Sequence, residues 1–133
     1  MDTHEARFGR TVLLATELDP IADAYRAAFG WTTLVDLEPT PGRRFLHVGP
    51  ASQPGVGLWF LTPESPEAHA RVGAQTGGEP TLVLYADDLD AVTAQAVDAG
   101  MAVSGEPGAD GGSRWRHLRD PLGNRIVLVE LTI

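Results

Sequence analysis

Residues 10–20 read RTVLLATELDP, and residues 81–91 read TLVLYADDLDA. Each stretch is an apolar run followed by an acidic residue and then by Leu-Asp. Both stretches continue into alanine-rich segments that end in glycine, at Gly30 and Gly100. A self-similarity that persists at one spacing indicates repeated structural units, so it decides the architecture before any single motif does. The sequence therefore predicts two copies of one unit.

The second halves of the two copies also match. The segment FLHV begins at Phe45 and the segment WRHL begins at Trp115, 70 positions later, and each is followed by a turn and an apolar run. Short apolar runs that are rich in β-branched and aromatic residues favour buried strands. Each copy is thus expected to be a βαβββ unit, with strands at 12–15, 32–37, 43–48 and 56–61 in the first copy and at 82–85, 102–104, 115–118 and 125–131 in the second.

One amphipathic helix is predicted after the first strand of each copy. In the first copy, the apolar side chains spaced as on one packed helix face are Ile21, Ala24, Tyr25 and Ala28. We expect Asp19 to cap this helix and Pro20 to take its first position, where a missing N–H costs nothing. In the second copy, Asp88 or Asp90 is expected to be the cap.

The connecting segments carry their own signals. Residues 120–123 read DPLG, which is typical of a type I turn and would join the last two strands. Residues 107–113 read PGADGGS and are expected to form a mobile loop. A chain of 133 residues is expected to be one domain, with unit one at about 8–62, a linker at about 63–78 and unit two at about 79–133.

Composition excludes several classes of function. The chain has no cysteine, which removes disulfides, thiolate metal sites and a thiol nucleophile. Its formal net charge is −8, and all ten basic residues are arginine, so we expect no nucleic-acid partner. The apolar runs are much shorter than the roughly 20 residues that cross a bilayer, and no secretory signal is expected at the start. We expect no membrane partner and a cytoplasmic location.

The order of elements, together with the closing stretch DPLGNRIVLVE at 120–130, resembles the vicinal-oxygen-chelate superfamily, the glyoxalase, bleomycin-resistance and dioxygenase group. The resemblance covers about residues 10–132. It implies an α+β fold in which two tandem βαβββ units form a cup-shaped mixed sheet around a cavity. It also implies a homodimer, and both swapped and unswapped pairings of the units occur in the family and leave the same sequence pattern.

The same resemblance bears on metal binding. Metal-dependent members draw ligands from the first and last strands of each unit, and the matching positions here are Arg10, Trp59, Thr81 and Val127. None of these residue types suits the site; arginine, for example, stays protonated and offers no lone pair. Glu130 lies in the last strand, but its parity differs from that of Val127, so it should point to the other face. We expect no metal and no cofactor.

Strand alternation nominates other residues for the cavity. Phe45 and His47 share one face of their strand, and Trp115 and His117 share one face of theirs. If Leu46 and Leu118 pack under the helices, both histidines face the cup. The family positions add the remaining ligand-binding candidates, which are Arg10, Trp59, Thr81 and Tyr85. Structural readings remain open at this point, because the histidines could be hydrogen-bonded strand residues, the tryptophans could be core, and the two histidines could form an unusual metal site.

Two functions from different classes follow. The favoured one is a metal-independent protein that binds a small molecule and sequesters an aromatic or cationic compound such as an antibiotic, as antibiotic-resistance proteins of this group do, by stacking it on Trp59 and Trp115. The alternative is a metal-free lyase or isomerase, with His47 or His117 as the base and Arg10 as a clamp for an oxyanion. A cavity filled by its own side chains would support neither function.

Overall fold

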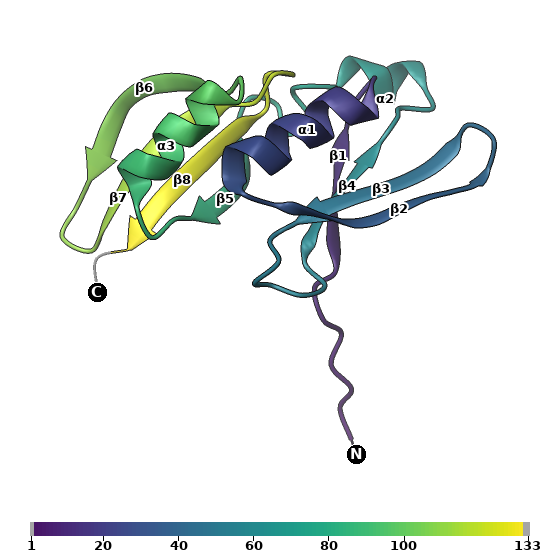
Figure 1. The fold of residues 1–133 in the computed structure, drawn as a ribbon, viewed down its shortest axis with the longest axis horizontal. Coiled ribbons are helices and arrows are strands. Elements are labelled where there is room, and N and C mark those ends of the chain that lie inside the picture. The colour runs from purple at the N-terminus through teal and green to yellow at the C-terminus, as the bar shows by residue number, and fades with distance from the viewer. Residues whose placement is uncertain (1, 132–133) are drawn as a thin grey trace.

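The computed structural model describes residues 2–131, and within them the chain forms two βαβββ units in sequence (Figure 1). The first unit comprises β1 (Arg10–Leu14), α1 (Leu18–Phe29), β2 (Thr32–Thr40), β3 (Arg43–Gly49) and β4 (Gly57–Leu61). After a short helix, α2 (Pro66–Ala70), the second unit comprises β5 (Pro80–Tyr85), α3 (Leu89–Asp98), β6 (Ala102–Ala109), β7 (Ser113–Arg119) and β8 (Arg125–Leu131).

Each unit forms its own four-stranded mixed sheet. The strand orders are β1-β4-β3-β2 and β5-β8-β7-β6, so the two sheets repeat one topology. In each sheet the first and last strands of the unit pair in parallel, and the other pairs are antiparallel. The predicted α+β fold built from two βαβββ units is confirmed. Between residues 2 and 131, no helix has the length and hydrophobicity needed to cross a bilayer.

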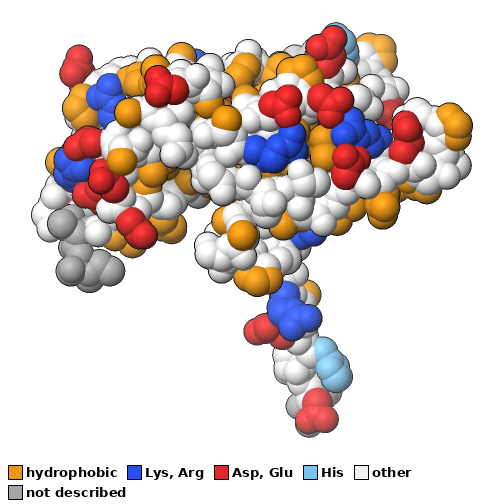
Figure 2. Space-filling view, in the orientation of Figure 1, with side chains coloured by type: hydrophobic (Ala, Val, Ile, Leu, Met, Phe, Trp, Pro, Cys, Tyr) orange, Lys and Arg blue, Asp and Glu red, His pale blue; other side chains and the backbone are white. Residues whose placement is uncertain are grey.

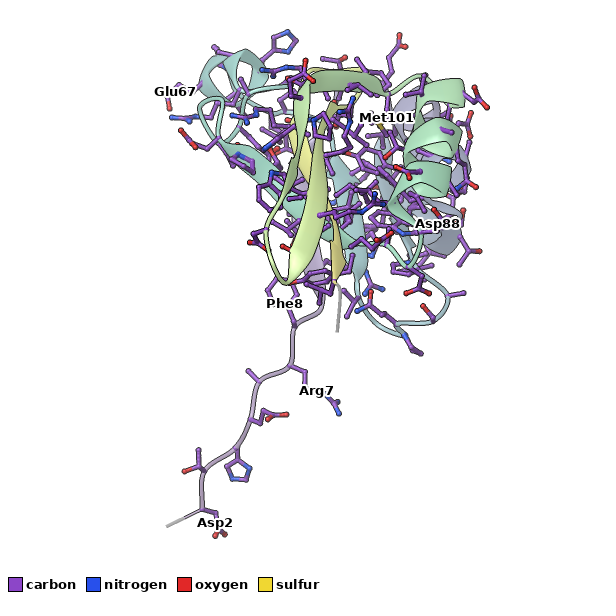
Figure 3. The ribbon with its side chains drawn as sticks, turned by 90° about the vertical axis from the view of Figure 1, so that its left-hand side faces the viewer. Asp2, Arg7, Phe8, Glu67, Asp88 and Met101 are labelled. Atoms are coloured by element: carbon purple, nitrogen blue, oxygen red, sulfur yellow. The ribbon has the colours of Figure 1, made fainter. Side chains whose placement is uncertain are left out.

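One helix covers one face of each sheet. The apolar stripe of α1 is buried as the spacing predicts, and it packs on buried strand residues of the first sheet, which are Leu13, Leu46, Val48, Leu58 and Phe60. The corresponding residues under α3 are Leu118, Ile126 and Leu128. The two helices lie side by side, and the outer side of this layer carries intermixed Arg and Asp or Glu side chains (Figures 1 and 2). Viewed from the side, helices and sheets form two layers, with residues Asp2 to Phe8 extending away from them (Figure 3).

Two local predictions are corrected by the structure. The cap of α1 is Glu17 rather than Asp19, which instead accepts a hydrogen bond from Arg44 at 2.9 Å. Pro20 is the third helical residue, which is also compatible with a free first turn. The segment 107–113 is the end of β6, a turn and the start of β7, because Asp110 Oδ1 accepts from the backbone N–H groups of Gly112 and Ser113 at 2.8 Å each.

Other capping and turn predictions are confirmed. Asp88 is the cap of α3, where its side chain accepts from the N–H of Ala91 at 3.0 Å. The N–H of Gly123 donates to the carbonyl of Asp120 at 2.9 Å, which closes the expected turn between β7 and β8.

A buried carboxylate joins the two units. Asp120 Oδ1 accepts from three backbone N–H groups of its own turn at 2.9–3.0 Å. Its Oδ2 accepts from the hydroxyl of Tyr25 on α1 and from the amide of Asn124, both at 2.8 Å. Burial, followed by the nearby Asp120 charge, raises the pKa of Tyr25 well above its usual value, so the phenol stays a donor. Five hydrogen bonds compensate the burial of this carboxylate.

Replacing Tyr25 with Phe should therefore destabilise the protein by about 1.5–3 kcal/mol, the range for a hydrogen bond to a charged group. Urea unfolding of wild type and variant measures the change. Tyr85→Phe is the matched control, because it removes the same hydroxyl from a ring that is 72% exposed within the chain, and it should lower the free energy of unfolding by less than Tyr25→Phe does. Equal stability of all three proteins would show that the carboxylate does not depend on Tyr25.

Candidate functional site

The predicted site residues of β3 and β7 lie on the sheet faces opposite the helices. Leu46 and Val48 of β3 are buried under α1, so Phe45 and His47 lie on the other side of that strand. Leu118 is buried in the same way, which places Trp115 and His117 on the free face of β7. We call these faces, which neither α1 nor α3 covers, the open faces.

The structure brings four predicted residues of the first unit together. Arg10 donates from Nε to Nδ1 of His47 at 2.9 Å, and its Nη1 donates to the carbonyls of Gly55 and Gly9. The rings of His47 and Trp59 have centroids 5.4 Å apart, and those of Phe45 and Trp59 are 5.7 Å apart. Strand register explains much of this cluster, because His47 is paired directly with Trp59. Arg10, at the start of β1 and paired with Gly57, reaches across β4 to the imidazole.

The hydrogen bond from Arg10 fixes the state of His47. A guanidinium only donates, so Nδ1 accepts and the neutral ring carries its proton on Nε2. Burial of the imidazole is the main reason that the pKa of His47 lies below its usual value, and the positive charge of Arg10 lowers it further. His47 Nε2 and Trp59 Nε1 are both buried and have no hydrogen-bond partner. The first open face therefore holds a neutral imidazole and an indole whose N–H groups are unpaired.

A second cluster lies on the open face of the second unit. Arg125 Nη2 is 3.3 Å from His117 Nδ1, and Arg125 Nη1 donates to the carbonyl of Gly78 at 2.9 Å. The indole of Trp115 lies flat against Gly108 of β6, where any Cβ would come within 2.1 Å of the ring. Arg125 was not predicted from the sequence. Its parity with Val127 in β8 was the signal that could have found it.

Two predicted residues lie outside both clusters. Thr81 sits at an irregularity in the pairing of β5 with β8, and its hydroxyl is 3.0 Å from that of Thr76 in the linker. Tyr85 is exposed and lines a cleft of about 980 Å³ between the two units, together with Phe29 and Trp31. The clusters themselves lie on separate sheets, so one chain does not bring all eight predicted residues into one pocket.

The structure gives positions that match metal ligands of the family different roles. Arg10 is engaged with His47, and Trp59 packs between Phe45 and His47. Glu130 lies on the helix side, as its parity predicts, where it accepts from the N–H of Leu89 at 2.7 Å. Within residues 2–131, no three His, Asp or Glu side chains are grouped as a metal site would require.

Comparisons with known proteins find a family match and similar folds. The sequence matches the Glyoxalase/Bleomycin resistance protein/Dioxygenase superfamily over residues 7–128. Among solved structures, TnmS3, an antibiotic-binding protein from Streptomyces sp. CB03234, is 24% identical with a TM-score of 0.78, and the match covers 98% of this chain and 100% of that one. UcmS2 is 26% identical with a TM-score of 0.78, and the match covers 95% of this chain and 98% of that one. No curated protein matches the sequence.

The lowered pKa of His47 predicts a pH dependence of stability. The unfolded chain binds a proton to this residue near pH 6.5, whereas the folded chain does so only at a lower pH. The contribution of neutral His47 to stability is therefore complete above the unfolded pKa and is lost as the pH falls through the folded pKa. Urea unfolding between pH 7.5 and pH 5 should show a smaller loss of stability for His47→Gln than for wild type.

His69→Gln is the control for this measurement, because His69 is exposed on α2 and should leave the pH profile of wild type unchanged. If His47→Gln and wild type lost the same stability over this range, the arginine–imidazole contact would not affect protonation.

Proposed function

Because the chain belongs to the Glyoxalase/Bleomycin resistance protein/Dioxygenase superfamily, we propose that it is a metal-independent protein that binds and sequesters an aromatic small molecule. The observation that carries the proposal is the cluster of Phe45, His47 and Trp59 on an open sheet face. Such a surface, apolar with a few polar groups, suits a flat ligand. An antibiotic is one such compound, since TnmS3, which shares the fold, is an antibiotic-binding protein.

Metal independence rests on residue types. A divalent ion in a site of this family needs imidazole, amide or carboxylate groups at the inner ends of four strands. This chain has guanidinium, indole, hydroxyl and isopropyl groups there, on Arg10, Trp59, Thr81 and Val127. We therefore propose that its ligand is held by stacking and hydrogen bonds.

The arrangement of His47 does not favour the alternative of a metal-free lyase or isomerase. A general base needs a free lone pair that can reach the substrate proton. In this protein Nδ1 of His47 is occupied by Arg10, and Nε2 carries the proton. The lowered pKa also makes the imidazole a weaker base. Sequestration requires neither property, so it is the function that this geometry supports better.

We further propose that a second copy of the chain completes each binding cavity. Apolar residues are strongly exposed on strands of both sheets, with Leu37 at 62%, Val83 at 56%, Tyr85 at 72% and Leu131 at 50%. Exposure of this kind is typical of an interaction surface. Within one chain the two units pack through α1 and α3, and the two clusters lie on separate sheets. We therefore propose that unit two of the partner covers the open face of unit one, which is the swapped pairing.

Binding should depend on Trp59 and not on the cleft between the units. Trp59→Leu is expected to weaken binding of 9-anthracenemethanol, a neutral planar probe, by about threefold to tenfold, the value of one aromatic contact. Fluorescence polarisation of the probe reports affinity without relying on tryptophan. Trp31→Leu is the control, because Trp31 lines the cleft instead. Loss of binding in Trp31→Leu alone would move the site to the cleft and contradict the proposal.

The oligomeric state provides a separate test. Wild type should sediment as a dimer at micromolar concentration, and Val83→Glu should sediment as a monomer because a charge would be buried at the interface. Val97→Glu places the same charge at an exposed position of α3 and should leave the dimer intact. A wild-type protein that sediments as a monomer at all concentrations tested would exclude the paired cavity.

A further inference from the structure

We infer that the ligand of the open faces is an aromatic compound with an anionic oxygen, a carboxylate or a phenolate, held by two arginine–histidine pairs. The pairs are Arg10 with His47 and Arg125 with His117. This inference rests on the proposed binding function and names the chemical class of the ligand. The sequence led us to expect an aromatic or a cationic compound. The present inference keeps the aromatic ring and replaces the positive charge with a negative one.

The first support is the distribution of ion pairs. Three arginines outside the open faces have carboxylate partners: Arg26 pairs with Asp23, Arg44 with Asp36 at 2.9 Å, and Arg114 with Glu130 at 3.2 Å. Arg116, on the helix side of β7, has no such partner among residues 2–131. On the open faces, Arg10 and Arg125 contact only imidazoles and backbone carbonyls within the described part of the chain. Both are half-buried in a chain with 18 acidic residues. A half-buried guanidinium without a counter-charge favours an anionic ligand.

The second support is the kind of polar atom left unpaired. Among residues 2–131, three buried polar atoms on the open faces lack a partner, and all three are nitrogens that carry hydrogen: His47 Nε2, Trp59 Nε1 and Arg125 Nε. Leaving such a donor unpaired costs about 1–3 kcal/mol, so an acceptor that reaches it is favoured. An ammonium group only donates and can pair with none of them. It would also be repelled by the charge of Arg10.

The third support is that the two units reach the same arrangement by different routes. In unit one the arginine comes from β1, where Arg10 is paired with Gly57 of β4. In unit two it comes from β8, where Arg125 is paired with Pro80 of β5. The two arginines do not occupy equivalent positions of the repeat. Pro80 corresponds to Arg10, and Gly57 corresponds to Arg125, so duplication of one unit cannot account for both arginines. A guanidinium beside the histidine Nδ1 is thus a shared property of the two open faces rather than a copied residue.

Three anthracene probes that differ only in charge test the inference. These are anthracene-9-carboxylate, 9-anthracenemethanol and 9-(aminomethyl)anthracene, titrated by fluorescence polarisation at 150 mM salt and pH 7.5. The carboxylate should bind at least about tenfold more tightly than the neutral alcohol, as expected for a charge-assisted hydrogen bond. The ammonium probe should bind more weakly than the alcohol.

Variants separate the local effect from the overall field of the protein. In the double variant Arg10→Met and Arg125→Met, carboxylate and alcohol should bind with equal affinity, and each single variant should lose part of the preference. The double variant Arg7→Met and Arg71→Met removes the same charge from exposed residues outside both clusters and should keep the preference of wild type. Equal loss in both double variants would assign the preference to net charge and overturn the inference.

The outcomes on wild type distinguish this inference from the function on which it rests. If the alcohol and the carboxylate bind equally, or if the ammonium probe binds most tightly, the anionic ligand class is wrong while aromatic binding stands. If none of the three planar probes binds at high micromolar concentration, the proposed binding function fails as well. Tenfold preference for the carboxylate that disappears only in the Arg10 and Arg125 variants supports the inference.

Discussion

The arrangement of this molecule depends on one buried carboxylate. Asp120 shapes the turn between β7 and β8 through its own backbone N–H groups, and the same side chain receives the hydroxyl of Tyr25 from α1. A carboxylate in this position would be strongly unfavourable without these partners. The bond therefore ties the first unit to the second at a fixed point. A second link, from Gln95 of α3 to the carbonyl of Ala28, lies between the two helices at 2.9 Å.

Joining the units through their helices determines what each sheet can do. With α1 and α3 packed together (Figure 1), the helix-covered faces become one continuous core, and neither of these helices covers the opposite faces. The outer edge of β1 is also occupied, because Gln75 of the linker bonds the N–H of Leu14 and the carbonyl of Val12 at 3.0 and 2.8 Å. An amide side chain thus takes hydrogen bonds that a neighbouring strand would otherwise make. Closure of a cup within one chain is disfavoured at that edge.

Much of this fold could be predicted because it is encoded by local patterns. Strand parity correctly separated Phe45 and His47 from the core, and Glu130 from the open face, since alternation depends only on the backbone. The position of Thr81 was less predictable, because it lies at a pairing irregularity that no periodicity reveals, with its hydroxyl 3.0 Å from that of Thr76. The bond between Tyr25 and Asp120 spans 95 residues and links two units, so a single sequence gave no sign of it. Arg125, the partner of His117, was missed for a related reason. It lies in β8, and β4, the corresponding strand of the first unit, contains no arginine.

The open faces carry residue types that differ from those of a chelating site. A chelating site requires several lone pairs directed at one point. These strands instead present side chains that donate hydrogen bonds or stack on aromatic rings. Arg10 illustrates the change: it occupies a position matched to a metal ligand and uses its N–H groups to fix the imidazole of His47 as a neutral donor. On the proposed function, the site therefore favours a hydrogen-bond acceptor rather than a cation. The strand framework is unchanged, because the residues that pack under the helices and those that face away are independent sets on alternating positions of the same strands.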